Sequence, residues 1–462
     1  MAEQTQKREK LGSRLGFILL SAGCAIGIGN VWKFPYIVGQ YGGGIFVLIY
    51  LFFLIIMGVP VMTMEFSLGR ASGKSPVLLY QQLEKPGHKW HIHGWAALIG
   101  NYLLMMFYVV VSGWMLLYFK DTAFGTLSDM NAAEVGAHFT NDVLDSPLAM
   151  LVSTFIVVLA GFLVCGFGVK KGLERVTKFM MIALLVLMIA IAVYCCCMDG
   201  ASEGLKFYLK PDLGRMKEAG IGEVIVAAMK QAFFTLSLGI GAMAIFGSYI
   251  GKERSLMGES VSVALLDTFV AFTSGLIVFP ACFAFNGGET TSGPSLIFVT
   301  LPNIFNNMPM GQLWGSLFFV FMVFAAFSTV IGVFELIVAC CCEKFGCSRV
   351  KSCVINGVLM CILALPCIFG FNIWSDFAPA GMNIMDWEDF LVSNILLPIG
   401  SLVFVLFCTT KWGWGWKNFE EEANAGKGMK VKKWMRWYMT FVLPVIIFIL
   451  FVVGILQAFN VM

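Results

Sequence analysis

The chain has 462 residues, of which 59% are hydrophobic and only 13% are charged, and its mean hydropathy is +0.83. An average soluble domain carries about 25% charged residues, so this composition excludes an ordinary soluble protein and indicates a chain built for a lipid bilayer. The net charge is only +3, and no basic patch with interleaved aromatic residues indicates a nucleic-acid partner.

Apolar stretches long enough to cross a membrane recur from one end of the chain to the other. They predict an all-α polytopic membrane protein with eleven transmembrane helices. The first stretch follows a basic segment, but it is too long for a signal peptide and lacks a small-residue cleavage site. The predicted spans are 15–37, 43–69, 95–119, 148–168, 174–197, 222–249, 259–285, 312–342, 351–371, 388–409 and 437–459.

The positive charges predict how these spans are oriented. With the N-terminus inside, 24 of the 31 Lys and Arg residues fall on the inner side and six on the outer side, while Lys230 lies within a span. Because Lys and Arg concentrate in cytoplasmic segments, we expect a cytoplasmic N-terminus and a C-terminus on the extracellular or periplasmic face of the cell membrane. Lys230 could extend its amine to the outer vestibule or pair with a nearby acid, and the sequence does not decide between these roles.

Glycines interrupt the first and sixth spans near the middle of the membrane. The first contains AGCAIGIGN at 22–30, and the sixth contains LSLGIGA at 236–242. Glycine in a membrane helix more often serves close helix packing. These two spans, however, are five apart and enter from opposite faces, as in the inverted five-helix repeats of many secondary transporters. We therefore predict two unwound helices in one transporter domain, 1–462, with repeats at 15–197 and 222–409 and an eleventh helix of unassigned role at 437–459.

Unwound backbone inside a membrane is tolerated where it lines a cavity or is buried in protein. Carbonyl groups at the ends of the half-helices can coordinate a small cation, and free amides at a half-helix N-terminus attract a carboxylate. The interruptions therefore predict a central site suited to sodium and a zwitterion.

The sequence at these positions resembles the neurotransmitter:sodium symporter family, whose bacterial members are mostly amino-acid transporters. The segments at 13–46 and 231–242 resemble the family's first and sixth helices. GVPVMTMEFSLGR, FAAFSTVIG and MDWEDF resemble its second, eighth and tenth, so the likeness runs in order from about residue 8 to residue 410. It implies the leucine-transporter-like fold, a 5+5 inverted repeat with unwound helices 1 and 6.

The resemblance implies two sodium sites made of oxygen atoms. The ligands of the first would be Ala25, Asn30, Thr235 and Asp267, with the substrate's carboxylate. Those of the second would be Gly23, Ile26, Ala325, Ser328 and Thr329. On the residues alone, hydroxyls such as those of Ser328 and Thr329 more often bond back to their own helix, and the match to the family pattern reverses this preference. No organic cofactor is implied.

Asp267 is an acid inside an apolar span, where an ionised carboxylate is costly unless it is compensated. Many family members have Asn at this position, and chloride-dependent relatives have Ser where this chain has Ala271. We infer that Asp267 supplies the negative charge that chloride provides elsewhere, so that transport does not require chloride. Proton countertransport through Asp267 is a weaker hypothesis. For Glu65, the resemblance implies a structural hydrogen bond to the unwound first helix.

The substrate implied by the resemblance is an amino acid, because Gly27 stands where monoamine-transporting relatives have Asp. Its carboxylate would meet the amides of Ile28 and Gly29 and the hydroxyl of Tyr108, although Tyr108 could also be an ordinary core aromatic residue. The predicted side-chain pocket has no ionisable group, which favours a neutral hydrophobic amino acid, with Leu, Ile, Met, Phe, Tyr and Trp left open. The predicted substrate-binding residues are Ala25, Gly27, Ile28, Gly29, Leu104, Tyr108, Phe234, Ser237, Ile240, Thr329 and Val333.

Alternating access needs two gates that are never open together, and charge pairs suit contacts that form and break. The resemblance assigns Lys33 and Asp389 to the outer gate, with Phe234 and Tyr108 as a lid. It assigns Arg8 and Glu343 to the inner gate. The family usually has Arg where this chain has Lys33, and Lys cannot make the same bidentate contact.

Three other classes of function compete with a sodium-coupled amino-acid symporter. A membrane enzyme is disfavoured, because the spans hold no HExxH motif and no nucleophile with a plausible base. An ion channel would fit the intramembrane carboxylates, but it would not explain the paired gates or Gly27. A substrate sensor on a transporter scaffold would bind without transporting. The expected partners are therefore sodium, a small amino acid and lipid, and the sequence does not predict an oligomeric state.

Overall fold

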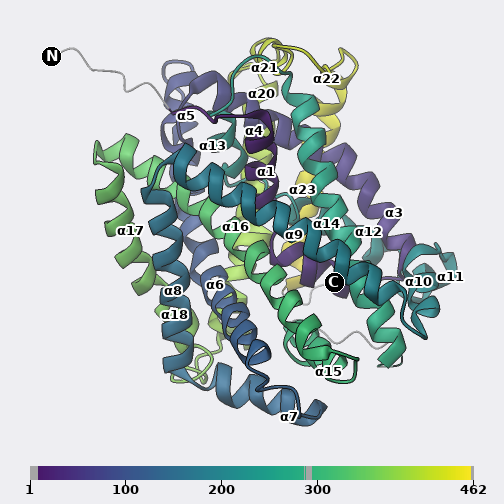
Figure 1. Cartoon of the computed structure of the whole chain (residues 1–462). Coiled ribbons are helices and arrows are strands. Elements are labelled where there is room, and N and C mark those ends of the chain that lie inside the picture. Colours follow the sequence, from purple (N-terminus) through teal and green to yellow (C-terminus); the bar gives the residue numbers. More distant parts are fainter. Residues whose placement is uncertain (1–8, 286, 288–293, 459–462) are drawn as a thin grey trace.

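The computed structural model describes residues 9–285, 287 and 294–458, and it is a bundle of helices. Among these residues one isolated β-bridge, between Arg254 and Lys427, is the only extended pairing. Long helices run along the bundle, while short helices gather at its ends: α5, α21 and α22 at one end, and α7 and α15 at the other (Figure 1). This is the all-α polytopic fold predicted from the apolar spans.

The elements of the first half of the chain follow the predicted spans closely. In order they are α1 (Arg14–Ala25), η1 (Gly29–Lys33), α2 (Phe34–Gln40), α3 (Gly44–Phe53), η2 (Leu54–Gly58), α4 (Val59–Ser72), α5 (Pro76–Leu83), α6 (His91–Ala123), α7 (Ala132–Ala137), η3 (His138–Leu144), α8 (Pro147–Gly166), η4 (Val169–Glu174) and α9 (Arg175–Cys196).

The second half continues with longer connecting segments, which form short helices of their own. Its elements are α10 (Ala201–Leu209), α11 (Leu213–Glu218), α12 (Ile221–Phe234), α13 (Ala242–Gly247), α14 (Leu256–Phe285), η5 (Leu296–Thr300), α15 (Leu301–Asn306), α16 (Gly311–Phe345), α17 (Arg349–Leu363), α18 (Leu365–Phe369), η6 (Pro379–Gly381), α19 (Ile384–Phe390), η7 (Leu391–Leu396), α20 (Leu397–Thr409), α21 (Trp416–Ala423), α22 (Met435–Trp437), η8 (Tyr438–Val442) and α23 (Leu443–Ala458).

Nine helical stretches within the described ranges are long and apolar enough to cross a membrane. A tenth is the bent pair Arg14–Ala25 and Gly29–Gln40, whose halves meet at 61°. The sixth predicted span consists of two shorter helices, α12 and α13, so it is not continuous, but it lies where the sequence predicted it. The eleven predicted spans are therefore present, two of them broken.

The centre of the bundle is formed by α6 and α16, which contact each other and are the most deeply buried of the long spans. The last span, which includes α23, is the least buried, so most of its side chains face outward toward lipid. The first span contacts both α14 and α16. The break in the first span is therefore enclosed by protein, as unwound backbone inside a membrane requires.

The two breaks have different local causes. In the first span, Ile26 is extended (φ −69°, ψ 103°) between α1 and the π-helical η1. In the sixth, Ser237, Gly239 and Gly241 have φ of +50°, +97° and +77°, a region that favours glycine. A Cβ atom on Gly239 would lie 2.2 Å from the Leu397 carbonyl oxygen, so no larger residue fits there.

Glu65 of α4 forms a hydrogen bond with the sixth span rather than with the first. Its carboxylate accepts a 2.6 Å hydrogen bond from the amide of Gly239, inside the break. The predicted structural role of Glu65 is thus correct, but the predicted partner is wrong. The reason is that the residues before α13 have amides that no preceding helical turn can satisfy, and a buried carboxylate supplies the acceptor.

Candidate transport site

The predicted residues of the first sodium site meet between the two broken spans and α14. The Asn30 side-chain amide donates to Thr235 Oγ1 at 3.0 Å and to Asp267 Oδ1 at 2.8 Å. Thr235 Oγ1 donates to Asp267 Oδ2 at 2.8 Å. All three side chains are buried, and Ala25 lines the same cavity as Asn30 and Thr235. Residues far apart in sequence thus form one polar cluster.

The cluster fits a cation, because its charge is not balanced by the protein. Asp267 is completely buried, and no Lys, Arg or His of the described chain forms an ion pair with it. Its hydrogen-bond partners Asn30 and Thr235 are neutral. A buried carboxylate without a counter-charge is costly, and sodium with its preference for oxygen ligands would compensate it.

The five residues predicted for the second sodium site also converge, where the first span crosses α16. Ser328 Oγ lies 2.7 Å from the Gly23 carbonyl oxygen and 2.9 Å from that of Ala325. Thr329 Oγ1 lies 3.4 Å from the Gly23 oxygen and 3.3 Å from the Ile26 oxygen. Both hydroxyls therefore reach across to the first span, and Ser328 also bonds back to its own helix. The donor set contains only oxygen atoms, as sodium requires.

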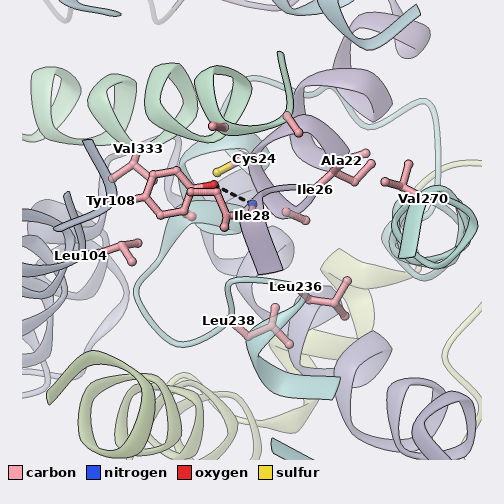
Figure 2. Packing of buried hydrophobic residues seen from close by; sticks show 14 of the residues in the cluster. Ala22, Cys24, Ile26, Ile28, Leu104, Tyr108, Leu236, Leu238, Val270 and Val333 are labelled. Carbon is pink, nitrogen blue, oxygen red and sulfur yellow. Dashed lines mark hydrogen bonds between the residues drawn. The ribbon is translucent and has the colours of Figure 1, made fainter. Parts of the chain in front are cut away.

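A small cavity between the breaks joins the two clusters. Tyr108 of α6 accepts a hydrogen bond from the Ile28 amide at 3.1 Å, as Figure 2 shows. None of the residues that line the cavity is an acid, a lysine, an arginine or a histidine. They are Ala25, Gly27, Gly29, Asn30, Leu104, Tyr108, Phe234, Thr235, Ser237, Ile240, Thr329, Val392 and Leu397. The lining is largely apolar and also includes amide and hydroxyl groups.

The lining agrees with most of the predicted substrate residues. Ile28 turns toward an adjoining outer cavity, to which Gly29, Tyr108 and Phe234 also contribute. Val333 is buried but does not line the cavity. Val392 and Leu397 do line it, and the sequence analysis missed them because nothing distinguishes one apolar residue of a span from another.

Two glycines allow the chain to pack this closely. A Cβ atom on Gly27 would lie 2.3 Å from the Tyr108 hydroxyl oxygen and 2.8 Å from Thr329 Oγ1. A Cβ atom on Gly29 would lie 2.6 Å from the Phe234 ring. A side chain at either position would therefore fill the cavity or displace its walls.

The two residues predicted to form the outer gate make a loose contact. Lys33 Nζ lies 4.0 Å from Asp389 Oδ2, with about a third of each side chain exposed, and it also sits 3.9 Å from the centre of the Phe234 ring. Ser393 donates a 2.7 Å hydrogen bond to Asp389. Lys33 thus lies over the Phe234 ring and makes no short ion pair with Asp389.

At the opposite end, Arg8 lies outside the described residues, so the predicted Arg8–Glu343 gate stays a prediction. Glu343 accepts hydrogen bonds from the amide and hydroxyl of Ser75 at 2.8 and 2.7 Å.

A network around the buried Glu335, which no sequence pattern predicted, lies close to this end. There Glu335 is bound by the Arg349 guanidinium and by the Tyr249 hydroxyl. Two of these groups come from helix ends that sequence spacing does not relate, so no local pattern signalled the network.

Lys230, unexplained by the sequence, donates a 2.8 Å hydrogen bond to Gln457 near the end of α23. Both residues line a polar cavity that also reaches Lys33 and Asp389. Lys230 therefore faces the same cavity as the Lys33–Asp389 pair and links the sixth span to the last.

Two interrupted helices that enclose a cavity, with a charge pair close by, are typical of secondary transporters that work by alternating access. A profile described as the Sodium:neurotransmitter symporter family matches residues 8–142 and 137–461. The chain belongs to this family, and it is a sodium-dependent, multi-pass membrane transporter.

Individual relatives match along their whole length. The uncharacterized sodium-dependent transporter YhdH of Bacillus subtilis is 35% identical over 458 residues, covering 98% of this chain and 99% of that protein. An uncharacterized sodium-dependent transporter of Haemophilus influenzae is 30% identical over 98% of this chain and 99% of its own length. The crystal structure of MhsT in complex with L-phenylalanine has a TM-score of 0.86 and 36% identity, covering 97% of this chain and 100% of that one.

Proposed function

We propose that the protein imports a neutral hydrophobic amino acid together with sodium and without chloride. The observation that carries the proposal is the cavity between the breaks, whose lining is mostly apolar, includes amide and hydroxyl groups, and has no Asp, Glu, Lys, Arg or His. Such a site satisfies a zwitterion's backbone groups and leaves only apolar surface for its side chain. The binding of L-phenylalanine by MhsT, which is similar over nearly its whole length, supports the same substrate class.

The substrate's carboxylate would bind at the Tyr108 hydroxyl and the Ile28 amide, which now form a hydrogen bond with each other. The amides of Ile28 and Gly29 lie at the start of η1, where no preceding helical turn supplies an acceptor. The Ile28 amide now donates to Tyr108, whose hydroxyl proton can turn toward a carboxylate. The side chain would lie among the apolar lining residues Leu104, Phe234, Ile240, Val392 and Leu397.

We propose that two sodium ions accompany each substrate. One would bind at Asn30, Thr235 and Asp267, beside the substrate's carboxylate. The bound sodium ion and the carboxylate would then stabilise each other. The second would bind at the oxygen atoms of Gly23, Ile26, Ala325, Ser328 and Thr329. Because those ligands belong both to the first span and to α16, sodium there would favour the arrangement in which these two elements are packed together.

Alternating access would follow from movement of the broken spans against the rest of the bundle. On the outer side, Lys33, Asp389 and Phe234 would close over the substrate. On the inner side, release would require the Arg8–Glu343 contact to open. With the N-terminus in the cytoplasm, the sodium gradient of a living cell would then drive import.

Chloride independence would follow from Asp267. It places a fixed negative charge beside the first sodium site, and Ala271, one helical turn further along α14, offers no hydroxyl with which to hold an anion. A carboxylate that is always present would remove the need for a second anion to balance sodium.

Equilibrium binding to the purified protein tests the proposed substrate class. Labelled L-phenylalanine should bind in sodium and not in potassium at equal chloride, and unlabelled Leu, Ile, Met or Trp should compete at least ten times better than Asp or Lys. Equal competition by Lys or Asp would show that the pocket accepts a charged side chain and would refute the proposed substrate. Sodium-dependent binding without uptake would instead indicate a sensor.

A further inference from the structure

A second cavity lies outside the transport site, where α6, α18 and α19 meet. These three elements contact one another, and Figure 1 shows α18 beside α6 and α8. The cavity has a volume of about 690 Å³, within the range of small-molecule sites. Its lining includes Met106, Pro366, Trp374, Asp376, Phe377 and Glu388.

The most unusual group in this cavity is Glu388. It is only 5% exposed, and neither of its carboxylate oxygens has a hydrogen-bond partner in the described part of the chain. Its polar neighbour is the buried thiol of Cys367, which is a weak donor. A buried carboxylate that lacks donors is costly, so the position favours a ligand that supplies them.

The transport site does not account for Glu388. Its neighbours Asp386 and Asp389 line the outer cavity, whereas Glu388 lines neither that cavity nor the central one. Asp386 also lies in the first turn of α19, where the helix dipole favours an acid, and Asp389 has Lys33 nearby. Glu388 alone has neither compensation, and it lines a separate cavity.

The rest of the lining adds negative charge and aromatic surface. The lining residues include two acids, Glu388 and Asp376, and no lysine, arginine or histidine. Trp374 and Phe377 supply ring faces, which attract organic cations, and Met106 and Pro366 supply apolar wall.

We propose that this cavity binds an organic ammonium with an apolar body, whose N–H groups donate to Glu388 and whose body packs against Trp374 and Phe377. The ammonium could belong to a soluble amine or to the ethanolamine headgroup of a lipid. The recognising chemistry is the same for both.

Calorimetric titration of the full-length protein with benzylammonium tests the site. Nonionic detergent and sodium-free potassium buffer keep the transport site from contributing. We expect saturable 1:1 binding, at least ten-fold weaker with Glu388→Gln and with the uncharged analogue benzyl alcohol. The matched variant Asp376→Asn removes an exposed acid of the same cavity and should weaken binding by less than about three-fold, because exposed charges contribute little.

The alcohol comparison needs no substitution, so the test holds even if Glu388→Gln folds poorly. Equal affinity for benzylammonium and benzyl alcohol, or unchanged affinity in a folded Glu388→Gln protein, would overturn the proposal. Added phosphatidylethanolamine assigns the source: competition with benzylammonium, lost in Glu388→Gln, identifies a lipid headgroup as the occupant. Undiminished amine binding in its presence identifies a soluble amine.

Discussion

Asn30 of the first broken span donates its side-chain amide to the Asp267 carboxylate of α14 at 2.8 Å. The same amide group reaches Thr235 at the edge of the second break, so one side chain joins both interruptions to a continuous helix. Its oxygen accepts the Gly27 amide at 3.2 Å. The negative charge of Asp267 therefore lies close to the place where sodium and substrate are proposed to bind.

Replacing this charge should create a requirement for chloride. Asp267→Asn keeps the shape of the cluster but removes its negative charge, so sodium-driven uptake in chloride-free buffer should fall at least ten-fold. The double variant Asp267→Asn with Ala271→Ser should recover uptake when chloride is added, because the new hydroxyl can help to hold the anion. Ala271→Ser alone is the control and should remain independent of chloride. Full chloride-free activity of Asp267→Asn would show that Asp267 does not replace the anion.

Gly27 should tolerate no side chain. Gly27→Ala places a Cβ atom 2.3 Å from the Tyr108 hydroxyl oxygen, so substrate affinity should fall more than ten-fold through displacement of that hydroxyl. Gly166→Ala, at the end of α8 with no atom within 4 Å of the new Cβ, is the matched control and should bind normally. Equilibrium binding of labelled substrate checks both. Unchanged affinity in Gly27→Ala would place the substrate elsewhere.

The outer charge pair should be weak enough to open in every cycle. Because Lys33 and Asp389 are each more than a third exposed and 4.0 Å apart, a double-mutant cycle with Lys33→Met and Asp389→Asn should give a coupling free energy of about 0–1 kcal/mol. Thermal unfolding of the four proteins measures it. A coupling above about 2 kcal/mol would mean that this contact is a structural clamp rather than a gate.

The buried pair at the other end should behave differently. Glu335 is fully buried and bound by Arg349 and Tyr249, so Glu335→Gln leaves a guanidinium that is only about a quarter exposed without its counter-charge. We expect a loss of about 3–5 kcal/mol in the free energy of unfolding. The control Glu421→Gln breaks an exposed pair with Lys417 and should change stability by less than about 0.5 kcal/mol. Equal effects of the two variants would contradict this account.

His138, in the short segment before α8, should make stability depend on pH. The hydrogen bond to Asp121 raises the pKa of His138 above 6.5, and Asp142 acts in the same direction. A raised folded-state pKa contributes stability that is complete below about pH 6.5 and is lost as the pH rises through the folded-state value. Hydrogen bonds to charged groups contribute about 1.5–3 kcal/mol.

The test compares melting temperatures of the wild type and His138→Gln, whose side chain is neutral at every pH. The wild type should exceed the variant by several degrees near pH 5.5 and by less near pH 8.5. A difference that does not change between these two pH values would show that His138 titrates as it does in the unfolded chain.

Sequence alone predicted the spans and both breaks, because apolar length and clustered glycines are local signals. The predicted ends of a span differ from the observed ends where polar residues extend the helix beyond its apolar run. The span predicted at 95–119, for example, is observed as His91–Ala123. The sodium-site residues were available only through the resemblance to the family, since no spacing relates Asn30 to Asp267 or Gly23 to Ser328.

Features that depend on packing could not be predicted. Val392 and Leu397 face the cavity because of how η7 and α20 sit against the breaks, and an apolar span gives no sign of which side faces a ligand. The partner of Glu65 was misassigned for a similar reason, because one carboxylate within a membrane can reach either break. Glu388 is one of several acids in MDWEDF, and only the structure shows that it is the buried one without a partner.

The central claim is that a sodium gradient drives a neutral hydrophobic amino acid through the site between the breaks. The most direct measurement is uptake of a labelled mixture of neutral amino acids into proteoliposomes, with an inward sodium gradient compared with an inward potassium gradient at equal chloride. The account predicts accumulation of hydrophobic amino acids above the external concentration in sodium only. Equal uptake in sodium and potassium, or accumulation of charged amino acids instead, would contradict it.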